Sequence, residues 1–308
     1  MNHHPWNPNI GGHKGPRFET VNNGLVRDNA TGLIWPRQAD VLEFPLSWPE
    51  AMDAVMAMNA QTALGRNDWR LPNRRELLSL VDFGQARPAA PPDHPFADLR
   101  QNWHWTSTTA AIAPRYAWYV HFAGGRTFYG RKDQYCLSLP VAGTPDTLPR
   151  TGQMSCFDAS GKRIDCQGTG HDGEMRLGVP WPEPRFEPLP DGCARDRLTD
   201  LVWTDSADLA GGLVAWDEAK ALAENLDAGG KIWRLPAIRE LESLVDASRH
   251  SPALPKGHPF QDVGEACWSG TNSPFENGWA YCLYIRKGAV GVGHKPGREF
   301  AVWAVSAP

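Results

Sequence analysis

Alternation of apolar and polar residues near the start of the chain predicts antiparallel strands. Residues 17–19 and 25–27 alternate in this way, and residues 28–32 (Asp-Asn-Ala-Thr-Gly) interrupt the pattern before the apolar run at 33–35. Asp, Asn and Gly favour tight turns, because they bond the local backbone or tolerate a left-handed conformation. We therefore expect strands joined by a hairpin turn at the start of the domain.

Apolar residues with helical spacing predict two short helices. Ser47 lies three residues before Glu50, which is the arrangement of a capping box, and apolar side chains then recur on one face up to Asn59. Asn73 and Glu76 repeat the arrangement at the start of a second helix. Matching helices are expected at residues 216–225 and 237–245.

The remainder of this region predicts strands that follow a long loop. Residues 84–102 are rich in proline and fit neither a helix nor a strand pattern. Strands are expected at residues 105–108, 116–122, 126–129 and 137–141, with a Gly-Gly hairpin before the third. This order predicts an α+β fold in which two helices flank a small, mainly antiparallel sheet.

The whole pattern occurs twice in the same order, so the chain is a tandem duplication. The motifs Trp-Arg-Leu-Pro, Arg-Glu-Leu and His-Pro-Phe stand at residues 69–72, 75–77 and 94–96 and again at 233–236, 239–241 and 258–260. A repeat of this length can bury a core of its own. The predicted organisation is an N-terminal tail (1–16), a first domain (17–143), a linker (144–184) and a second domain (185–308).

Tryptophan is frequent, with 14 residues in the chain, and many occupy matched positions in the two copies. Matched rings are interpreted as core, because they serve the shared scaffold. These are Trp35, Trp48, Trp69 and Trp105 in the first copy and Trp203, Trp216, Trp233 and Trp268 in the second. The others are freer to bind a partner, namely Trp6, Trp103, Trp118, Trp181, Trp279 and Trp303.

Charge and hydropathy exclude some classes of partner. The formal net charge is −4 with interleaved signs, so the chain has no basic stripe and no nucleic-acid partner is expected. No stretch approaches the length of a transmembrane helix, and the N-terminus carries no export signal. The expected compartment is the cytoplasm if Met1 is the native start, and outside the cytoplasm if it is not.

Two of the six cysteines are placed to form a disulfide. Cys156 and Cys166 flank a predicted turn at Gly161, and a hairpin there would bring the two sulfur atoms opposite each other. A disulfide conflicts with a reducing cytoplasm, so the reduced and the oxidised forms both stay open. The remaining cysteines are interpreted as small core residues, namely Cys136, Cys193, Cys267 and Cys282.

Several spaced motifs together resemble the Lcl C-terminal domain family. They lie at residues 28–35, 69–77, 80–82, 105–108 and 117–122. The family is grouped with the C-type lectin fold, so the resemblance implies two tandem C-type-lectin-like domains, and its function is catalogued as unknown. The Trp-Arg-Leu-Pro element is also distantly similar to relatives of formylglycine-generating enzyme. Residues 151–173 are similar to a preamble often found before such domains.

The sequence contains no pattern of a catalytic or transition-metal site, so no catalytic residue and no cofactor are predicted. Formylglycine-generating relatives use two cysteines close together, and Cys267 and Cys282 are too far apart in sequence. The tripeptides with which C-type lectins bind calcium and sugar are missing as well. Structural calcium stays open, because backbone carbonyl ligands leave no trace in a sequence.

The repeated charged residues at the helix starts are interpreted as structural. Arg70 and Glu76, like Arg234 and Glu240, stand on either side of a helix N-terminus. There a carboxylate and a guanidinium can satisfy backbone donors and each other.

What remains is a binding surface on the copy-specific loops and the last hairpin. In the first copy it comprises Trp103, His104, Arg115, Tyr116, Arg126, Tyr129 and Arg131, and in the second Phe275, Glu276, Asn277, Trp279, Arg286, Lys287 and His294. Aromatic and arginine side chains suit recognition of a protein or a polysaccharide. The expected function is that of a non-catalytic recognition or adaptor protein. The alternatives are a metal or cysteine oxidoreductase of the formylglycine-generating type, or an accessory subunit of a larger enzyme complex.

Overall fold

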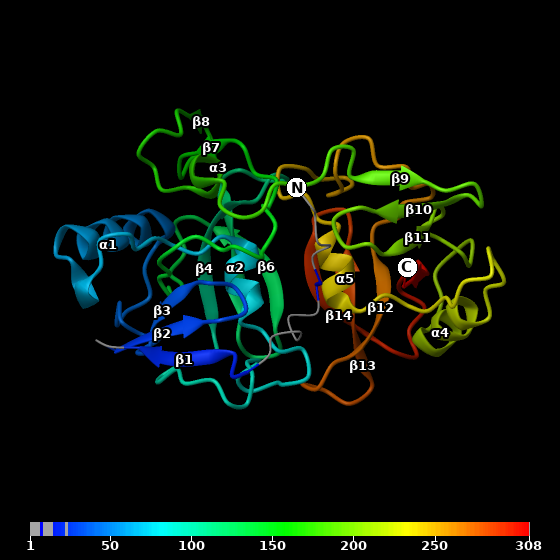
Figure 1. Cartoon of the computed structure of the whole chain (residues 1–308), viewed down its shortest axis with the longest axis horizontal. Helices are drawn as coiled ribbons and strands as arrows, with labels where there is room; N and C mark the ends of the chain where they lie inside the picture. Colours follow the sequence, from blue (N-terminus) through cyan, green and yellow to red (C-terminus); the bar gives the residue numbers. More distant parts are fainter. Residues whose placement is uncertain (1–6, 9–14, 22–23, 308) are drawn as a thin grey trace. The chain divides into compact units, whose positions relative to one another are not determined.

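The computed structural model describes residues 7–8, 15–21 and 24–307, which fall into two compact units (Figure 1). Each unit is mixed α+β and contains small antiparallel sheets. The first unit spans Ile10–Pro180 and the second contains Trp181–Pro308. Residues 144–180 therefore pack with the first unit. Most of the predicted N-terminal tail (1–16), including Trp6, lies outside the described residues.

The first unit begins with a three-stranded antiparallel sheet. Its strands are β1 (Phe18–Val21), β2 (Leu25–Asp28) and β3 (Ile34–Pro36), in the order β1-β2-β3. The turn between β2 and β3 closes when the backbone N–H groups of Thr31 and Gly32 donate to the Asp28 carbonyl. Gly32 has a φ of 75°, which glycine adopts without steric cost. The predicted hairpin is confirmed.

Both predicted helices of the first copy are present, and each begins directly after its expected capping residue. They are α1 (Trp48–Ala60) and α2 (Arg74–Ser79), with the short 3₁₀ turn η2 (Ala63–Gly65) between them. The Glu50 carboxylate accepts hydrogen bonds from the Ser47 backbone N–H and hydroxyl, at 2.8 and 2.6 Å. At α2, Asn73 Oδ1 accepts from the Glu76 N–H at 3.0 Å, and the Glu76 carboxylate accepts from the Asn73 N–H at 2.7 Å.

A second antiparallel sheet follows the long loop. Its strands are β4 (Trp103–Thr109), β5 (Tyr116–His121) and β6 (Arg126–Arg131), in the order β4-β5-β6. Residues 84–102, all of them described, contain no helix or strand, as expected. In Figure 1, α2 lies beside this sheet, and it contacts both β4 and β5.

The strand predicted at residues 137–141 is wrong. Within this segment Leu137 and Val141 make single bridges to His104 and Arg70, which belong to different parts of the unit. Cys136 and Ala142, on its two sides, bridge to two further segments. A segment whose successive residues bond different neighbours cannot form one regular ladder. Instead it connects the two sheets to the region of the helices.

The segment that follows is short and irregular. It contains the hairpin of β7 (Cys156–Phe157) and β8 (Arg163–Ile164), and the single helical turn α3 (Asp172–Met175). The turn α3 contacts β4 and β7. Residues predicted to link the two domains therefore cover part of the first one.

The second unit repeats the architecture. Its elements are β9 (Phe186–Pro188), β10 (Cys193–Asp196), β11 (Val202–Thr204), α4 (Trp216–Glu224), α5 (Ile238–Ser243), β12 (Cys267–Asn272), β13 (Trp279–Tyr284), β14 (Ala289–His294) and β15 (Val305–Ser306). The sheet orders are β15-β11-β10-β9 and β12-β13-β14. Both helices predicted for this copy are confirmed.

All eight matched tryptophans lie in the cores, as predicted, and each is at most 7% exposed. Trp105 packs with Trp48 and other residues of α1, and Trp268 packs with Trp216 of α4 in the same way. Trp118 and Trp303 are also buried, so the expectation that they are free to bind a partner is wrong. Among the unmatched rings, Trp103, Trp181 and Trp279 keep partial exposure.

A repeated ion pair ties the first sheet of each copy to the second helix. Arg17 donates to the buried Asp28 carboxylate at 3.1 and 2.8 Å and to the Ser79 carbonyl at 2.8 Å. Arg185 makes the matching three contacts at 3.0, 2.8 and 2.9 Å. These charges serve the shared scaffold, since both copies use them identically.

Candidate functional site

The residues predicted as a binding surface in the first copy are divided between the two faces of the β4–β5–β6 sheet. Cross-strand partners in an antiparallel ladder point to the same face. The register pairs Trp103 with His121 and then His121 with Arg126, so these three share one face. Tyr116 pairs with Arg131 on the opposite face. The predicted set is therefore not one continuous surface.

The face that carries Tyr116 and Arg131 is largely covered. Tyr129 belongs to it and packs edge-on against Tyr116 and Trp118, with ring centroids 5.8 and 5.3 Å apart. The Arg74 guanidinium of α2 lies 4.2 Å from the Trp118 ring centroid. Because α2 rests on this face, Tyr129 and Tyr116 remain only half-exposed.

His104 and the two exposed arginines do not extend a common surface. His104 is buried against Phe122, and burial lowers its pKa to about 4, so the ring is neutral and belongs to the core. Arg131 is exposed and pairs with the neighbouring Asp133. Arg115 is exposed, and its backbone lies against the turn at Gly161, where an added Cβ would come within 2.8 Å of the Arg115 nitrogen.

The opposite face presents an aromatic cluster that is only partly covered. The Trp103 ring lies between Tyr119 and His121, with centroid distances of 4.2 and 4.3 Å. Tyr119 also contacts the buried Trp105 ring at 5.5 Å, which connects the cluster to the core under α1. We call Trp103, Tyr119, His121, Arg126 and Phe128 the aromatic face.

Phe128 completes the aromatic face on the edge strand β6. It pairs with Tyr119 in the ladder and is 37% exposed, and its ring stacks on that of the neighbouring Tyr129 at the sheet edge, with centroids 4.7 Å apart. The close packing of Tyr119 depends on Gly130, because a Cβ there would lie 2.5 Å from Tyr119 Cε1. The exposed rings of Phe44 and Tyr135 lie near the ends of the Leu46–Cys136 bridge, beside the core that Trp103 and Tyr119 cover.

Burial sets the protonation of the aromatic face. It raises the pKa of Tyr119 to about 12 and lowers the pKa of His121 below its usual value, so both side chains are neutral at pH 7. His121 Nδ1 lies 2.6 Å from the Ala123 carbonyl, which orients the ring. Arg126 supplies positive charge beside these neutral rings. The face offers flat apolar area with a cation at its edge.

The second copy lacks this face, although its sheet has the same register. Trp268 pairs with Cys282 as Trp105 pairs with Tyr119, which makes Cys282 the counterpart of Tyr119. Gly291 stands opposite Cys282 in the position of Phe128. Tyr284 lies over Gly291, where a Cβ would come within 2.5 Å of its ring. The shared fold thus does not require the aromatic cluster.

The predicted surface of the second copy lies at two ends of its sheet. Trp279 and His294 form a cross-strand pair with ring centroids 5.5 Å apart, and Phe275, Glu276 and Asn277 belong to the loop that precedes β13. At the other end of the strand lie Arg286 and Lys287. Arg286 pairs with Glu265 at 2.7 Å, and Lys287 lies over the Tyr284 ring at 4.8 Å. These two residues are separated from the others by the length of β13.

The charged pairs interpreted as structural lie at the helix starts. Arg70 donates two hydrogen bonds to the buried Glu76 carboxylate, at 2.6 and 2.8 Å, and a third to the Gly143 carbonyl. Arg234 makes the same bidentate pair with Glu240 at 2.7 Å for both bonds. Because each glutamate also accepts a backbone N–H at its helix start, it is fully engaged.

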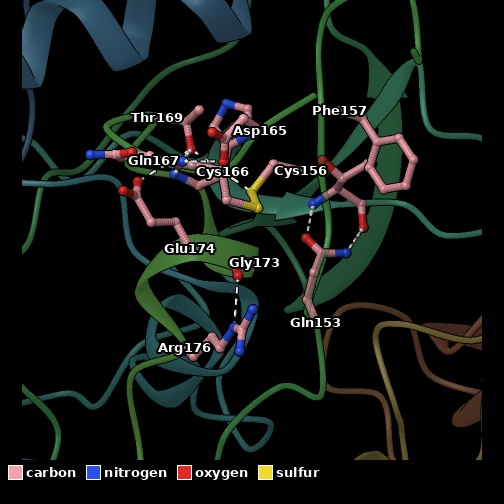
Figure 2. The surroundings of a disulfide bond; sticks show 12 residues. Gln153, Cys156, Phe157, Asp165, Cys166, Gln167, Thr169, Gly173, Glu174 and Arg176 are labelled. Atoms are coloured by element: carbon pink, nitrogen blue, oxygen red, sulfur yellow. Dashed lines mark hydrogen bonds between the residues drawn. A yellow bond between two sulfur atoms is a disulfide. The ribbon is translucent and has the colours of Figure 1, made fainter. Parts of the chain in front are cut away.

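We call residues 144–180, which pack on the rest of the first unit, the covering segment. It contains a disulfide between Cys156 and Cys166, with an S–S distance of 2.15 Å (Figure 2). Gln153 fastens the segment to β4, because its amide accepts from the Thr109 N–H and donates to the Thr109 carbonyl, both at 2.7 Å. The turn at Gly161 has a φ of 85°. The hairpin geometry expected from the spacing of the cysteines is present.

Three titratable groups are buried where this segment meets the first unit. The Lys132 ammonium donates to Thr109 Oγ1 and to the carbonyls of Phe157 and Asp158, at 3.1, 2.7 and 3.3 Å. Burial lowers the pKa of Lys132 to about 7. Burial also raises the pKa of Asp172 to about 6 and lowers that of His171 to about 4.

Hydrogen bonds and a ring contact explain how these groups are held. The Asp172 carboxylate accepts from the hydroxyls of Thr108 and Thr151, both at 2.7 Å. His171 lies against the Trp48 ring, with centroids 4.5 Å apart, and Lys132 Nζ lies 4.0 Å from the same ring centroid. The Asp172–Thr108 and His171–Trp48 contacts, with the hydrogen bonds from Lys132 to the segment backbone, join the covering segment to β4, to α1 and to the end of β6. The cluster therefore fixes the segment in place.

Sequence reasoning missed Tyr119, His121 and Phe128. The signal was present, because the Gly-Gly hairpin after β5 fixes which residues of β5 and β6 face each other. Had the register been worked out, Tyr119 and Phe128 would have emerged as a cross-strand pair. The burial of His104, in contrast, has no local signal.

The cysteines and metal donors give no support for a reactive centre. Cys136, Cys193, Cys267 and Cys282 are buried and unpaired, as expected for core residues. Burial and the neighbouring Cys267 raise the pKa of the Cys282 thiol well above its usual value, which disfavours the reactive thiolate. Within the described residues, no group of three or more His, Cys, Asp or Glu side chains is placed to hold a metal ion. No helix in that part of the chain is long and apolar enough to cross a membrane.

Comparison with known proteins identifies the repeated unit. The chain belongs to the Lcl C-terminal domain family, whose model matches residues 24–142 and 192–306. The two matches correspond to the two copies, and the covering segment at 144–180 lies between them. None of the curated proteins matches the chain.

Proposed function

We propose that this protein is a non-catalytic recognition or adaptor protein that binds an extended partner, a glycan chain or a polypeptide, on the aromatic face of the first unit. The observation that carries the proposal is the partly exposed Trp103 ring held between Tyr119 and His121, at 4.2 and 4.3 Å. The second copy has the same sheet without these rings. An aromatic cluster that the fold does not need is best explained by a role in binding.

The chemistry of the aromatic face suits such a partner. Flat rings bind the apolar faces of sugars or of side chains with little loss of conformational entropy, since each ring is already fixed by its neighbours. Arg126 adds several hydrogen-bond donors at the edge. Because Tyr119 and His121 are neutral at pH 7, an apolar partner can cover them without the cost of removing a charge from water.

We further propose that each unit is a C-type-lectin-like domain. Two short helices, a small sheet near the start of the copy and a three-stranded antiparallel sheet near its end support this assignment. In the second unit, β15 returns to pair with β11, which brings the end of the copy next to its beginning. Domains of this kind bind partners through surfaces that vary over a constant scaffold.

Binding by full-length protein to a panel of polysaccharides, and capture of proteins from native lysate, test the proposal. The variant carries Trp103→Ala and Phe128→Ala, and we expect its affinity for any captured partner to fall by about 30-fold, the effect of losing one interface hot spot. The matched control is Trp279→Ala, which removes an equally large, half-buried ring from the second copy.

Circular dichroism and the melting temperature verify that both variants remain folded. Unchanged affinity in the folded double variant would contradict the proposal. Near-stoichiometric copper in the purified protein, or selective alkylation of Cys282, would favour the oxidoreductase alternative. A stoichiometric protein partner whose binding requires Trp103 would support an adaptor or accessory role.

A further inference from the structure

A second feature of the first unit lies between α1 and the disulfide-bonded segment, and its lining shares no residue with the aromatic face. Here the structure contains a pocket of about 400 Å³. Its apolar lining comes from both sides, with Met52, Val55, Met56 and Leu71 on one and Met175 and Leu177 on the other. This volume is within the range of small-molecule sites in proteins.

Two polar side chains that line the pocket, those of Asn59 and Arg70, are already engaged by the protein. The Asn59 amide both donates to and accepts from the backbone of Trp69, at 2.8 and 2.6 Å. Arg70 is held by Glu76 and the Gly143 carbonyl. A ligand that needs strong hydrogen bonds would find few free partners here, whereas an apolar ligand would lose little by entering.

Three of the lining residues are methionines. The chain contains six methionines, and Met52, Met56 and Met175 all border the pocket. Met56 is 56% exposed and Met175 is 41% exposed. Both side chains are therefore accessible to solvent, and packing within the protein does not account for them. Flexible, polarisable methionine side chains adapt to ligands of varied shape.

The second copy shows that the fold does not require apolar residues at these positions. The helices α1 and α4 both begin at a matched tryptophan, so Lys220 and Glu224 of α4 correspond to Met52 and Met56 of α1. Lys220 and Glu224 form an exposed pair at 3.9 Å. The same helical face is thus charged and solvated in one copy and apolar beside a pocket in the other.

The disulfide helps to form one wall of the pocket. Gly168, Thr169 and Gly170 line it, and one residue separates them from Cys166. Thr169 donates to the Cys166 carbonyl at 2.8 Å. Glu174 of α3 accepts from the N–H of Gly170 at 2.7 Å, and Figure 2 shows Glu174 and Thr169 beside the disulfide.

We propose that this pocket binds a neutral, mainly apolar small molecule, and that the loop after Cys166 closes on it. The methionines supply the contact surface, and the disulfide holds the loop at the distance that the pocket requires. This site is separate from the aromatic face and does not rest on the function proposed for it.

The probe for this site is N-phenyl-1-naphthylamine, a neutral aromatic molecule, added to full-length oxidised protein with ¹³C-labelled methionine methyl groups. We expect the methyl resonances of Met52, Met56 and Met175 to shift on titration, and that of Met154 to stay. Met154 is 61% exposed and does not line the pocket, so it serves as the internal control. Probe fluorescence gives the affinity.

Two substitutions test the lining. Met56→Glu introduces the residue that the second copy carries, and Met175→Gln keeps a similar shape with added polarity. Together they should weaken probe binding about tenfold or more, since each buried methylene contributes about 0.8 kcal/mol and 1.4 kcal/mol is a factor of ten. Met154→Gln should leave the affinity unchanged. Both replaced methionines are substantially exposed, so the variants are expected to fold.

Absence of methyl shifts up to the solubility of the probe, or shifts confined to other methionines, would overturn the proposal. Equal affinity in the M56E/M175Q and M154Q variants would overturn it too. The role of the loop is tested by Cys156→Ser with Cys166→Ser, which should weaken binding severalfold in protein whose methyl spectrum shows a folded first unit. Unchanged affinity in that variant would show that the disulfide does not contribute to probe binding.

Discussion

The two copies build the same ion pair at the start of the second helix, yet they leave it in different surroundings. The Arg70 side chain is 8% exposed and that of Arg234 is 42% exposed, while the two glutamates are both buried. In the first unit, Arg70 donates to the Gly143 carbonyl and lines the same pocket as residues 168–170. An identical bond can thus be solvated in one copy and enclosed in the other, depending on the segment packed beside it.

The β4–β5–β6 and β12–β13–β14 sheets share their register but differ in the side chains that they carry. The first copy keeps large rings at positions where the second has Cys282 and Gly291, and the second copy fills its own space with Tyr284. Scaffold residues such as Trp105 and Trp268 stay equivalent and buried. The comparison separates what the fold needs from what the first copy has added, namely the covering segment, the aromatic face and the methionine pocket.

The largest expected effect comes from removing the arginine of the repeated ion pair. Arg70→Ala leaves the buried Glu76 carboxylate without its partner, which should destabilise the first unit by about 3–5 kcal/mol. Arg234→Ala should cost the second unit only about 1–3 kcal/mol, because water can reach the exposed side of its pair. Hydrogen exchange resolved to α2 and α5 measures the two losses separately.

An exposed pair provides the control for this comparison. Arg131 and Asp133 are 58% and 60% exposed, so Arg131→Ala should change stability by less than about 1 kcal/mol. Equal losses for Arg70→Ala and Arg234→Ala would mean that enclosure of the pair in the first unit has no energetic consequence.

The next effect concerns the disulfide. Replacing Cys156 and Cys166 by serine removes a constraint on the unfolded chain, and the first unit should lose about 2–3 kcal/mol for a loop of this size. The second unit should keep its stability, because the described cysteines in it are unpaired. Urea unfolding followed by exchange in each unit measures both. Loss of protection in the second unit would show that the two units do not respond independently.

The last effect, which is the smallest per unit of pH, is a pH dependence that stems from the buried Lys132. The folded state lowers the pKa of Lys132 from 10.5 to about 7, so the unfolded chain binds more protons between these values. Stability contributed by the neutral amine is present above the unfolded pKa and is lost as the pH falls through about 7. Stability of the first unit should therefore rise between pH 7 and 10.5, by at most about 1.4 kcal/mol per pH unit.

A comparison with a variant that lacks the amine separates the contribution of Lys132 from those of other groups that titrate at high pH. The difference in unfolding free energy between the wild type and Lys132→Met is measured at several pH values. A difference that does not vary between pH 7 and 10 would show that the three oxygen acceptors and the Trp48 ring keep the ammonium charged throughout.

The sequence alone determined the duplication, the helix starts, the hairpins and the matched core tryptophans. Each of these depends on short-range chemistry, such as the capping of α2 by Asn73 or the turn at Gly32, or on a comparison of the two copies along the chain. Local interactions of this kind keep their meaning whatever the rest of the chain does. For this reason the helix starts and the hairpins agree closely with expectation.

Only the tertiary structure decided which side chains meet. The pairing of β4 with β5 places Tyr119 and His121 beside Trp103, while His104, one residue along β4, turns into the core. Residues 136–142 satisfy their backbone through bridges to distant segments, so no local pattern describes them. The covering segment is the largest example, since its Asp172 and Gln153 bond β4, more than 40 residues away, and this pairing follows from packing rather than from any spacing in the sequence.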